Sequence, residues 1–82
     1  MDKIKILWAD DEIDLLKPHI IFLEEKGYEV VAVHSGNDAL EEVFNHDFSL
    51  IFLDEQMPGL TGMETLEKIR AKNPHTPIVI LT

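Results

Sequence analysis

The sequence contains no cysteine and few basic residues. The lack of cysteine excludes both a disulfide framework and a thiolate metal site. Lys and Arg number 7 against 16 Asp and Glu, which gives a formal net charge of −9. This balance argues against direct nucleic-acid binding by the segment, because neutralising phosphates requires basic side chains. It fits a domain that holds a cation or meets a basic partner.

Long hydrophobic runs are also missing. The opening Met1–Lys5 lacks the apolar core of a signal peptide, and no run approaches the length of a membrane span. We therefore expect a cytoplasmic protein that does not enter the membrane. The 82 residues allow one domain at most. A chain of this size buries only about 60% of its unfolded surface, which predicts marginal stability.

Short apolar runs alternate with segments of helical periodicity. The runs are rich in β-branched residues, which predicts strands at about residues 4–9, 28–33, 48–53 and 77–82. The alternation predicts an α/β fold with a mostly parallel sheet and right-handed crossovers. A sheet that ended on the last of these strands would have a bare edge, which natural proteins avoid. We therefore expect at least one further helix, and a further strand, beyond this sequence.

Three helices are predicted between the strands from apolar residues spaced by three and four positions. We expect Ser35 and Thr61 to be N-caps, Gly27 to end the first helix, and Pro18 to kink that helix or delay its start. Trp8 is expected in the core. The helical positions expected to face the sheet are Ile13, Leu16, Ile20 and Leu23, then Ala39, Leu40, Val43 and Phe44, then Met63, Leu66 and Ile69.

Carboxylates follow two of the predicted strands at the point where each strand ends. Asp10 and Asp11 follow the first strand, and Asp54 ends the apolar run before the turn at Pro58–Gly59. Carboxyl ends of parallel strands meet at one sheet edge, where α/β folds bind ligands. On neighbouring strands, about 4.8 Å apart, these side chains can converge. Two unit charges 5 Å apart repel by roughly 3 kcal/mol at an effective dielectric near 20, so we predict a hard cation there, Mg²⁺.

A carboxylate beside a metal also suggests phosphoryl chemistry. Asp54 can act as a nucleophile towards phosphorus and form an acyl phosphate. Thr82, at the end of the fourth strand, can donate its hydroxyl to a phosphoryl oxygen. Simpler explanations exist for each residue taken alone: Asp54 as a turn residue, Thr82 as an ordinary strand residue, and Glu12 as an acid near a helix N-terminus. For Glu12 we prefer the simpler explanation.

Three segments resemble the receiver domain of two-component response regulators over the whole supplied length. They are the first strand with Asp10–Glu12, the segment Leu53–Gly62, and Pro77–Thr82. The resemblance implies a flavodoxin-like, doubly wound parallel sheet with strand order 2-1-3-4(-5). Residues 1–82 would be its N-terminal part, with the fifth strand and the last two helices missing. It also implies a regulatory domain, not an enzyme, that assists only its own phosphotransfer and dephosphorylation.

The resemblance further implies roles for individual residues. Asp54 would accept the phosphoryl group from a sensor histidine kinase or phosphotransfer protein, and Thr82 would be the switch hydroxyl. Asp11 would bind Mg²⁺ directly, Asp10 mainly through water, and Gln56 through its backbone carbonyl. The family's phosphate-pairing Lys would lie beyond Thr82, so the segment by itself should bind metal but phosphorylate poorly. A C-terminal output domain and a homodimer formed on phosphorylation are also implied.

Three alternative functions make different demands on these residues. A HAD-like phosphatase with an Asp nucleophile normally has a second Asp two residues later as general acid, where this chain has Gln56. A flavodoxin-like cofactor binder needs a phosphate-holding loop after the first strand, where Asp10 and Asp11 would repel phosphate without a metal. An inert interaction module with the receiver fold stays open, because the phosphate-pairing Lys is not in the sequence.

Overall fold

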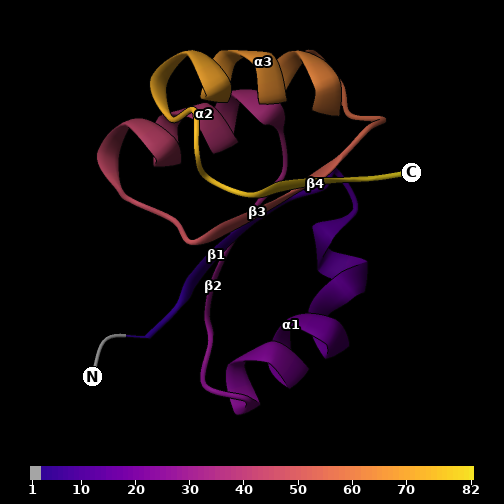
Figure 1. Cartoon of the computed structure of the whole chain (residues 1–82). Coiled ribbons are helices and arrows are strands. Elements are labelled where there is room, and N and C mark those ends of the chain that lie inside the picture. The colour runs from indigo at the N-terminus through magenta and orange to yellow at the C-terminus, as the bar shows by residue number, and fades with distance from the viewer. Residues whose placement is uncertain (1–2) are drawn as a thin grey trace.

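A four-stranded parallel sheet forms the middle layer of the computed structural model, which describes residues 3–82 (Figure 1). The strands are β1 (Lys5–Ala9), β2 (Glu29–Val33), β3 (Leu50–Asp54) and β4 (Ile78–Leu81). Their order is β2-β1-β3-β4, and every pairing is parallel. The predicted α/β class and the flavodoxin-like strand order are therefore confirmed.

Helices cover both faces of the sheet. Helix α1 (Lys17–Glu25) lies on one face, and α2 (Gly36–Asn45) and α3 (Gly62–Lys72) lie together on the other (Figure 1). A 3₁₀ turn, η1 (Ile13–Leu16), precedes α1, so the helix has the late start expected from Pro18. Pro18 lies in the first turn of α1, where its missing N–H leaves no helical bond unmade.

Gly27 ends α1 as predicted. Its φ of 97° is in the left-handed region that favours glycine. Its N–H donates to Glu24 O over 3.0 Å, and the Tyr28 N–H donates to Leu23 O over 3.1 Å. These two bonds form a Schellman motif, which satisfies carbonyls at the helix end and turns the chain into β2.

The main core lies between the sheet and the α2–α3 layer. Alternate strand residues point into it, as the two-residue period of a strand requires. On the opposite face Trp8 is buried and meets Phe52 edge-on, with ring centroids 5.2 Å apart, so its predicted core position is confirmed. The buried residues of the main cluster are Leu7, Ala9, Ala39, Val43, Ile51, Leu53, Met57 and Ile69.

Two predicted core positions are wrong. Met63 is 50% exposed and Phe44 is 68% exposed. In α3 the inward position belongs to Thr65, whose buried hydroxyl is satisfied by donating to Thr61 O over 2.8 Å. Met63 is two residues away, which places it on the outer side of the helix. The Phe44 ring faces solvent and contacts the Lys72 ammonium, which lies 4.7 Å from the ring centroid.

Helices α2 and α3 approach closely at Gly36. A Cβ on Gly36 would lie 2.1 Å from Thr65 Oγ1 and 3.1 Å from Leu60 Cβ. Thr65 cannot easily give way, because its side chain is fully buried and hydrogen-bonded. A glycine at this position is therefore required by space.

We expect Gly36→Ala to lower the free energy of unfolding by about 1–2 kcal/mol. Forcing an extra methyl group into a well-packed contact costs about 1–3 kcal/mol. This cost exceeds the gain of about 0.5–1 kcal/mol that alanine brings to a helix relative to glycine. Urea unfolding measures the difference. Asn37→Ala, at the exposed neighbouring position, is the matched control. A Gly36→Ala variant as stable as this control would show that the two helices do not pack this closely.

Candidate metal centre

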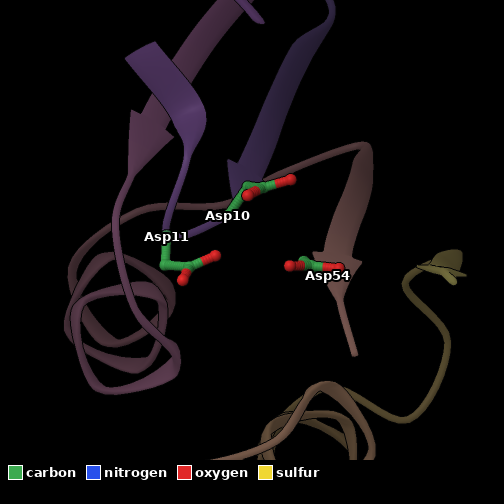
Figure 2. Close-up of side chains that lie close together, drawn as sticks. All are labelled: Asp10, Asp11 and Asp54. Carbon is green, nitrogen blue, oxygen red and sulfur yellow. The ribbon is translucent and has the colours of Figure 1, made fainter. Parts of the chain in front are cut away.

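The acidic residues predicted to converge do so at the carboxyl edge of the sheet. Strands β1 and β3 are direct neighbours with Ala9 paired to Leu53, so Asp10 and Asp54 follow side by side. Each of Asp10, Asp11 and Asp54 offers a carboxylate oxygen, and these atoms all lie within 4.8 Å of one another. Figure 2 shows the Asp11 and Asp54 carboxylates pointing towards each other across the gap between the two strand ends. We call these three residues the acidic cluster.

Asp10 is held in place by the turn that follows β1. Its N–H donates to Val33 O over 3.1 Å, and its Oδ1 accepts the Glu12 N–H over 2.8 Å. The Ile13 N–H then donates to Asp10 O over 3.1 Å and begins η1. The same carboxylate therefore shapes the loop and contributes to the cluster, while Asp11 is exposed at the loop surface.

The position of Asp54 at the end of β3, beside two other carboxylates, raises the pKa of its carboxyl. Burial raises the pKa of its carboxyl, as do the negative charges of Asp10 and Asp11, whereas hydrogen bonds from the Gln56 and Glu55 backbone N–H groups oppose the rise. The folded state thus binds this proton more tightly than the unfolded state. The contribution of this one carboxyl to the stability of the metal-free protein therefore falls as pH rises from about the ordinary Asp pKa of 3.8 through the raised folded value.

The donor set fits a hard divalent cation. Within the described residues 3–82 the cluster consists of carboxylates alone, and Mg²⁺ prefers such oxygen ligands, commonly one or two of them with water completing its shell. A cation among the three charges would also offset the repulsion that raises the Asp54 pKa. The residues present are therefore compatible with the predicted Mg²⁺.

A surface hollow opens beside the acidic cluster. Thr82 follows β4 directly, and Leu81 is paired with Asp54 across the sheet, so Thr82 reaches the same edge. Gln56 lies in the loop after β3. The structure thus brings all five predicted site residues to one place. The hollow is lined by Asp11, Glu12, Asp54, Glu55, Gln56 and Thr82.

Glu55 is the site residue that sequence reasoning missed. Its side-chain Oε1 accepts the Met63 N–H over 2.9 Å, at the start of α3. The one signal in the sequence is an acid shortly before a capping box, and this signal is weak because acids in loops are common.

None of the helices described in residues 3–82 is long and apolar enough to cross a membrane. The model of the family described as the response regulator receiver domain matches residues 6–82. The uncharacterized transcriptional regulatory protein YkoG of Bacillus subtilis is 35% identical over 82 residues, which are 100% of this chain and 36% of the relative. The chain thus spans about a third of the length of this curated relative.

Two similar solved structures contain the response regulator TrrA of Thermotoga maritima. One is TrrA in complex with Mg²⁺-BeF, with a TM-score of 0.88 and 35% identity, covering 96% of this chain and 69% of that chain. The other is the histidine kinase ThkA in complex with TrrA, with a TM-score of 0.87 and 35% identity, covering 96% of this chain and 68% of that chain. These likenesses extend over nearly all of the sheet and helices described above.

Proposed function

Since the chain belongs to the response regulator receiver domain family and is a signal receiver, we propose that it accepts a phosphoryl group on Asp54 with the help of Mg²⁺. The observation that carries the proposal is the acidic cluster. Carboxylate oxygens of Asp54, Asp10 and Asp11 lie within 4.8 Å of one another there, beside a hollow. In this proposal Asp11 binds the ion directly, Asp10 binds it mainly through water, and Gln56 binds it through its backbone carbonyl.

The chemical step is a transfer between two residues. A carboxylate oxygen of Asp54 forms a bond to phosphorus while the phosphorus–nitrogen bond of the donor phosphohistidine breaks, and the electron pair leaves with the imidazole. Bound Mg²⁺ would neutralise charge on the phosphoryl oxygens during this step. The Thr82 hydroxyl, at the rim of the hollow, would donate a hydrogen bond to a phosphoryl oxygen and so act as the switch.

Partners are proposed from the same family membership. The complex of TrrA with the kinase ThkA supports a sensor histidine kinase or phosphotransfer protein as donor. The name of YkoG supports an output domain that acts in transcription. We also propose a homodimer formed on phosphorylation and a cytoplasmic location. The domain would be regulatory and would assist only its own phosphotransfer and dephosphorylation.

The alternatives differ from this proposal at identifiable residues. Gln56 lines the hollow at the position where a phosphatase would have its second Asp, and an amide cannot act as that general acid. Phosphate of a flavodoxin-type cofactor would face the carboxylates of Asp10 and Asp11. An inert receiver-fold module predicts no Mg²⁺-dependent phosphoryl transfer, so the experiment below separates it from the proposal.

We expect the full-length protein to gain one phosphoryl group from acetyl phosphate when Mg²⁺ is present and none in EDTA. Intact-mass spectrometry measures the gain.

Asp11→Asn should weaken Mg²⁺ binding at least about tenfold, since second-shell changes alone often cost that much. Asp14→Asn, which alters an exposed acid paired with His34 outside the cluster, is the control. Equal mass gain in EDTA, or unchanged Mg²⁺ affinity of Asp11→Asn, would contradict the proposal.

A further inference from the structure

Glu55 connects three parts of the fold beside the acidic cluster. Its backbone N–H donates to Leu81 O over 3.1 Å, at the β4 side of the sheet. Its backbone carbonyl accepts the Gly62 N–H over 3.1 Å, and its side-chain Oε1 accepts the Met63 N–H over 2.9 Å. One half-buried residue therefore fixes the end of β3 to both β4 and the start of α3.

These bonds complete the N-terminus of α3. The first four N–H groups of an α-helix have no partner within the helix. In α3 two of them belong to the capping box, in which Thr61 N–H donates to Glu64 Oε1 and Glu64 N–H donates to Thr61 Oγ1. The other two, on Gly62 and Met63, donate to Glu55. The carboxylate of Glu55 also lies at the positive end of the helix dipole, where a negative charge is favoured.

The same bonds close the loop that carries Gln56. The loop leaves β3 at Glu55 and returns at Gly62 and Met63, so its two ends are hydrogen-bonded to each other. Its middle is held by Met57, which is 7% exposed within the core. Gln56 lies between these two fixed points. The contact of Glu55 with α3 therefore opposes a shift of the Gln56 backbone relative to Asp54.

We infer that Glu55 is a positioning residue that couples the acidic cluster to the first turn of α3. Its carboxylate holds the loop so that the Gln56 backbone faces the cluster, and binding of a cation there tightens the first turn of the helix. Because coupling between two sites is reciprocal, loosening that turn weakens cation binding. This inference rests on the proposed function, since it assumes Mg²⁺ as the ion that the cluster holds.

Two substitutions separate the hydrogen bond of Glu55 from its charge. Glu55→Gln keeps an oxygen acceptor for the Met63 N–H and removes the charge, whereas Glu55→Ala removes both. Glu12→Ala is the matched control, because Glu12 lines the same hollow but makes no side-chain capping bond. Mg²⁺ affinity is measured by titration. The amide exchange of Gly62 and Met63 is followed by NMR with and without Mg²⁺.

We expect Glu55→Gln and Glu12→Ala to weaken Mg²⁺ binding by about two- to fivefold, through loss of a nearby charge. Glu55→Ala should weaken it by about a further fivefold, the scale of a lost helix cap. In the metal-free Glu55→Ala protein the Met63 amide should exchange about tenfold faster than in the wild type. Mg²⁺ should no longer slow that exchange, whereas Glu55→Gln should restore the slowing.

The inference is overturned if Glu55→Ala binds Mg²⁺ as tightly as Glu55→Gln, or if Mg²⁺ leaves the exchange of Gly62 and Met63 unchanged in the wild type. A wild type that binds no Mg²⁺ would overturn the proposed function, and the coupling with it. Exchange in the metal-free variants would then still show whether Glu55 caps α3, so the two failures can be told apart.

Discussion

Replacing Asp54 by Asn should abolish the gain of a phosphoryl group and at the same time make the metal-free protein more stable at neutral pH. The amide is not a nucleophile towards phosphorus. The substitution also removes a carboxyl group whose pKa is raised by burial and by the negative charges of Asp10 and Asp11. Two unit charges about 4 Å apart repel by about 1 kcal/mol in water, so a gain of that size, about 4–8 °C in Tm for a domain of this size, is expected in EDTA. Thermal unfolding and intact-mass spectrometry measure the two effects.

Added Mg²⁺ and falling pH should each reduce the stability advantage of Asp54→Asn over the wild type. Saturating Mg²⁺ should stabilise the wild type by about 2.7 kcal/mol at one hundred times its Kd, and Asp54→Asn clearly less. The gain from Asp54→Asn in EDTA should shrink as pH falls towards the raised pKa of Asp54, because the wild-type carboxyl is then protonated. Asp47→Asn, an exposed acid before β3, is the control. A less stable Asp54→Asn protein in EDTA would refute the charge repulsion.

Gly62→Ala should lower the free energy of unfolding by about 2–3 kcal/mol and weaken Mg²⁺ binding. A Cβ at Gly62 would lie 2.6 Å from Asp54 O and 3.0 Å from Glu55 Cα. These are main-chain atoms, so no side-chain rotation can relieve the contact. Either α3 must withdraw from the loop, or the end of β3 that carries Asp54 must move, and overpacking of this kind costs about 1–3 kcal/mol.

Urea unfolding and Mg²⁺ titration test this expectation together. Met63→Ala serves as control, because Met63 is 50% exposed and its amide can still donate to Glu55 after the substitution. Gly62 does not have a positive φ, so backbone strain adds nothing to the cost of alanine there. If Gly62→Ala matched Met63→Ala in both measurements, the close approach between α3 and the Asp54 backbone would be disproved.

The acidic cluster could be predicted from the sequence because it depends on topology alone. Alternating strands and helices predict a parallel sheet, and the carboxyl ends of parallel strands share one edge. Asp10, Asp11 and Asp54 each stand directly after an apolar run, so their convergence needs only that the first and third strands be neighbours. The structure has that pairing. The caps at Gly27 and Thr61 were predictable for a similar reason, because each depends on residues close in the sequence.

Features that depend on how elements pack could not be predicted in this way. Met63 was expected to be buried because it is apolar, but the inward side of α3 is fixed by its close contacts through Gly62 and Thr65. A buried threonine is acceptable there because its hydroxyl is satisfied within the helix. Glu55 was missed because its bond to the Met63 amide exists only once the loop has closed.

Several predictions remain for experiment. The roles of Asp11, Asp10 and Gln56 towards Mg²⁺, and of Thr82 as the switch, are supported by their shared place at one sheet edge and hollow. That a fifth strand and two further helices follow residue 82 also stays a prediction. A phosphate-pairing Lys is proposed for that part of the protein.

The location of the phosphoryl group tests the central claim most directly. The phosphorylated full-length protein is treated with borohydride, which reduces an acyl phosphate to an alcohol, and the modified residue is identified by tandem mass spectrometry. The account predicts reduction at Asp54 that depends on Mg²⁺ during phosphorylation. Modification at any other residue, with Asp54 unchanged, would contradict it.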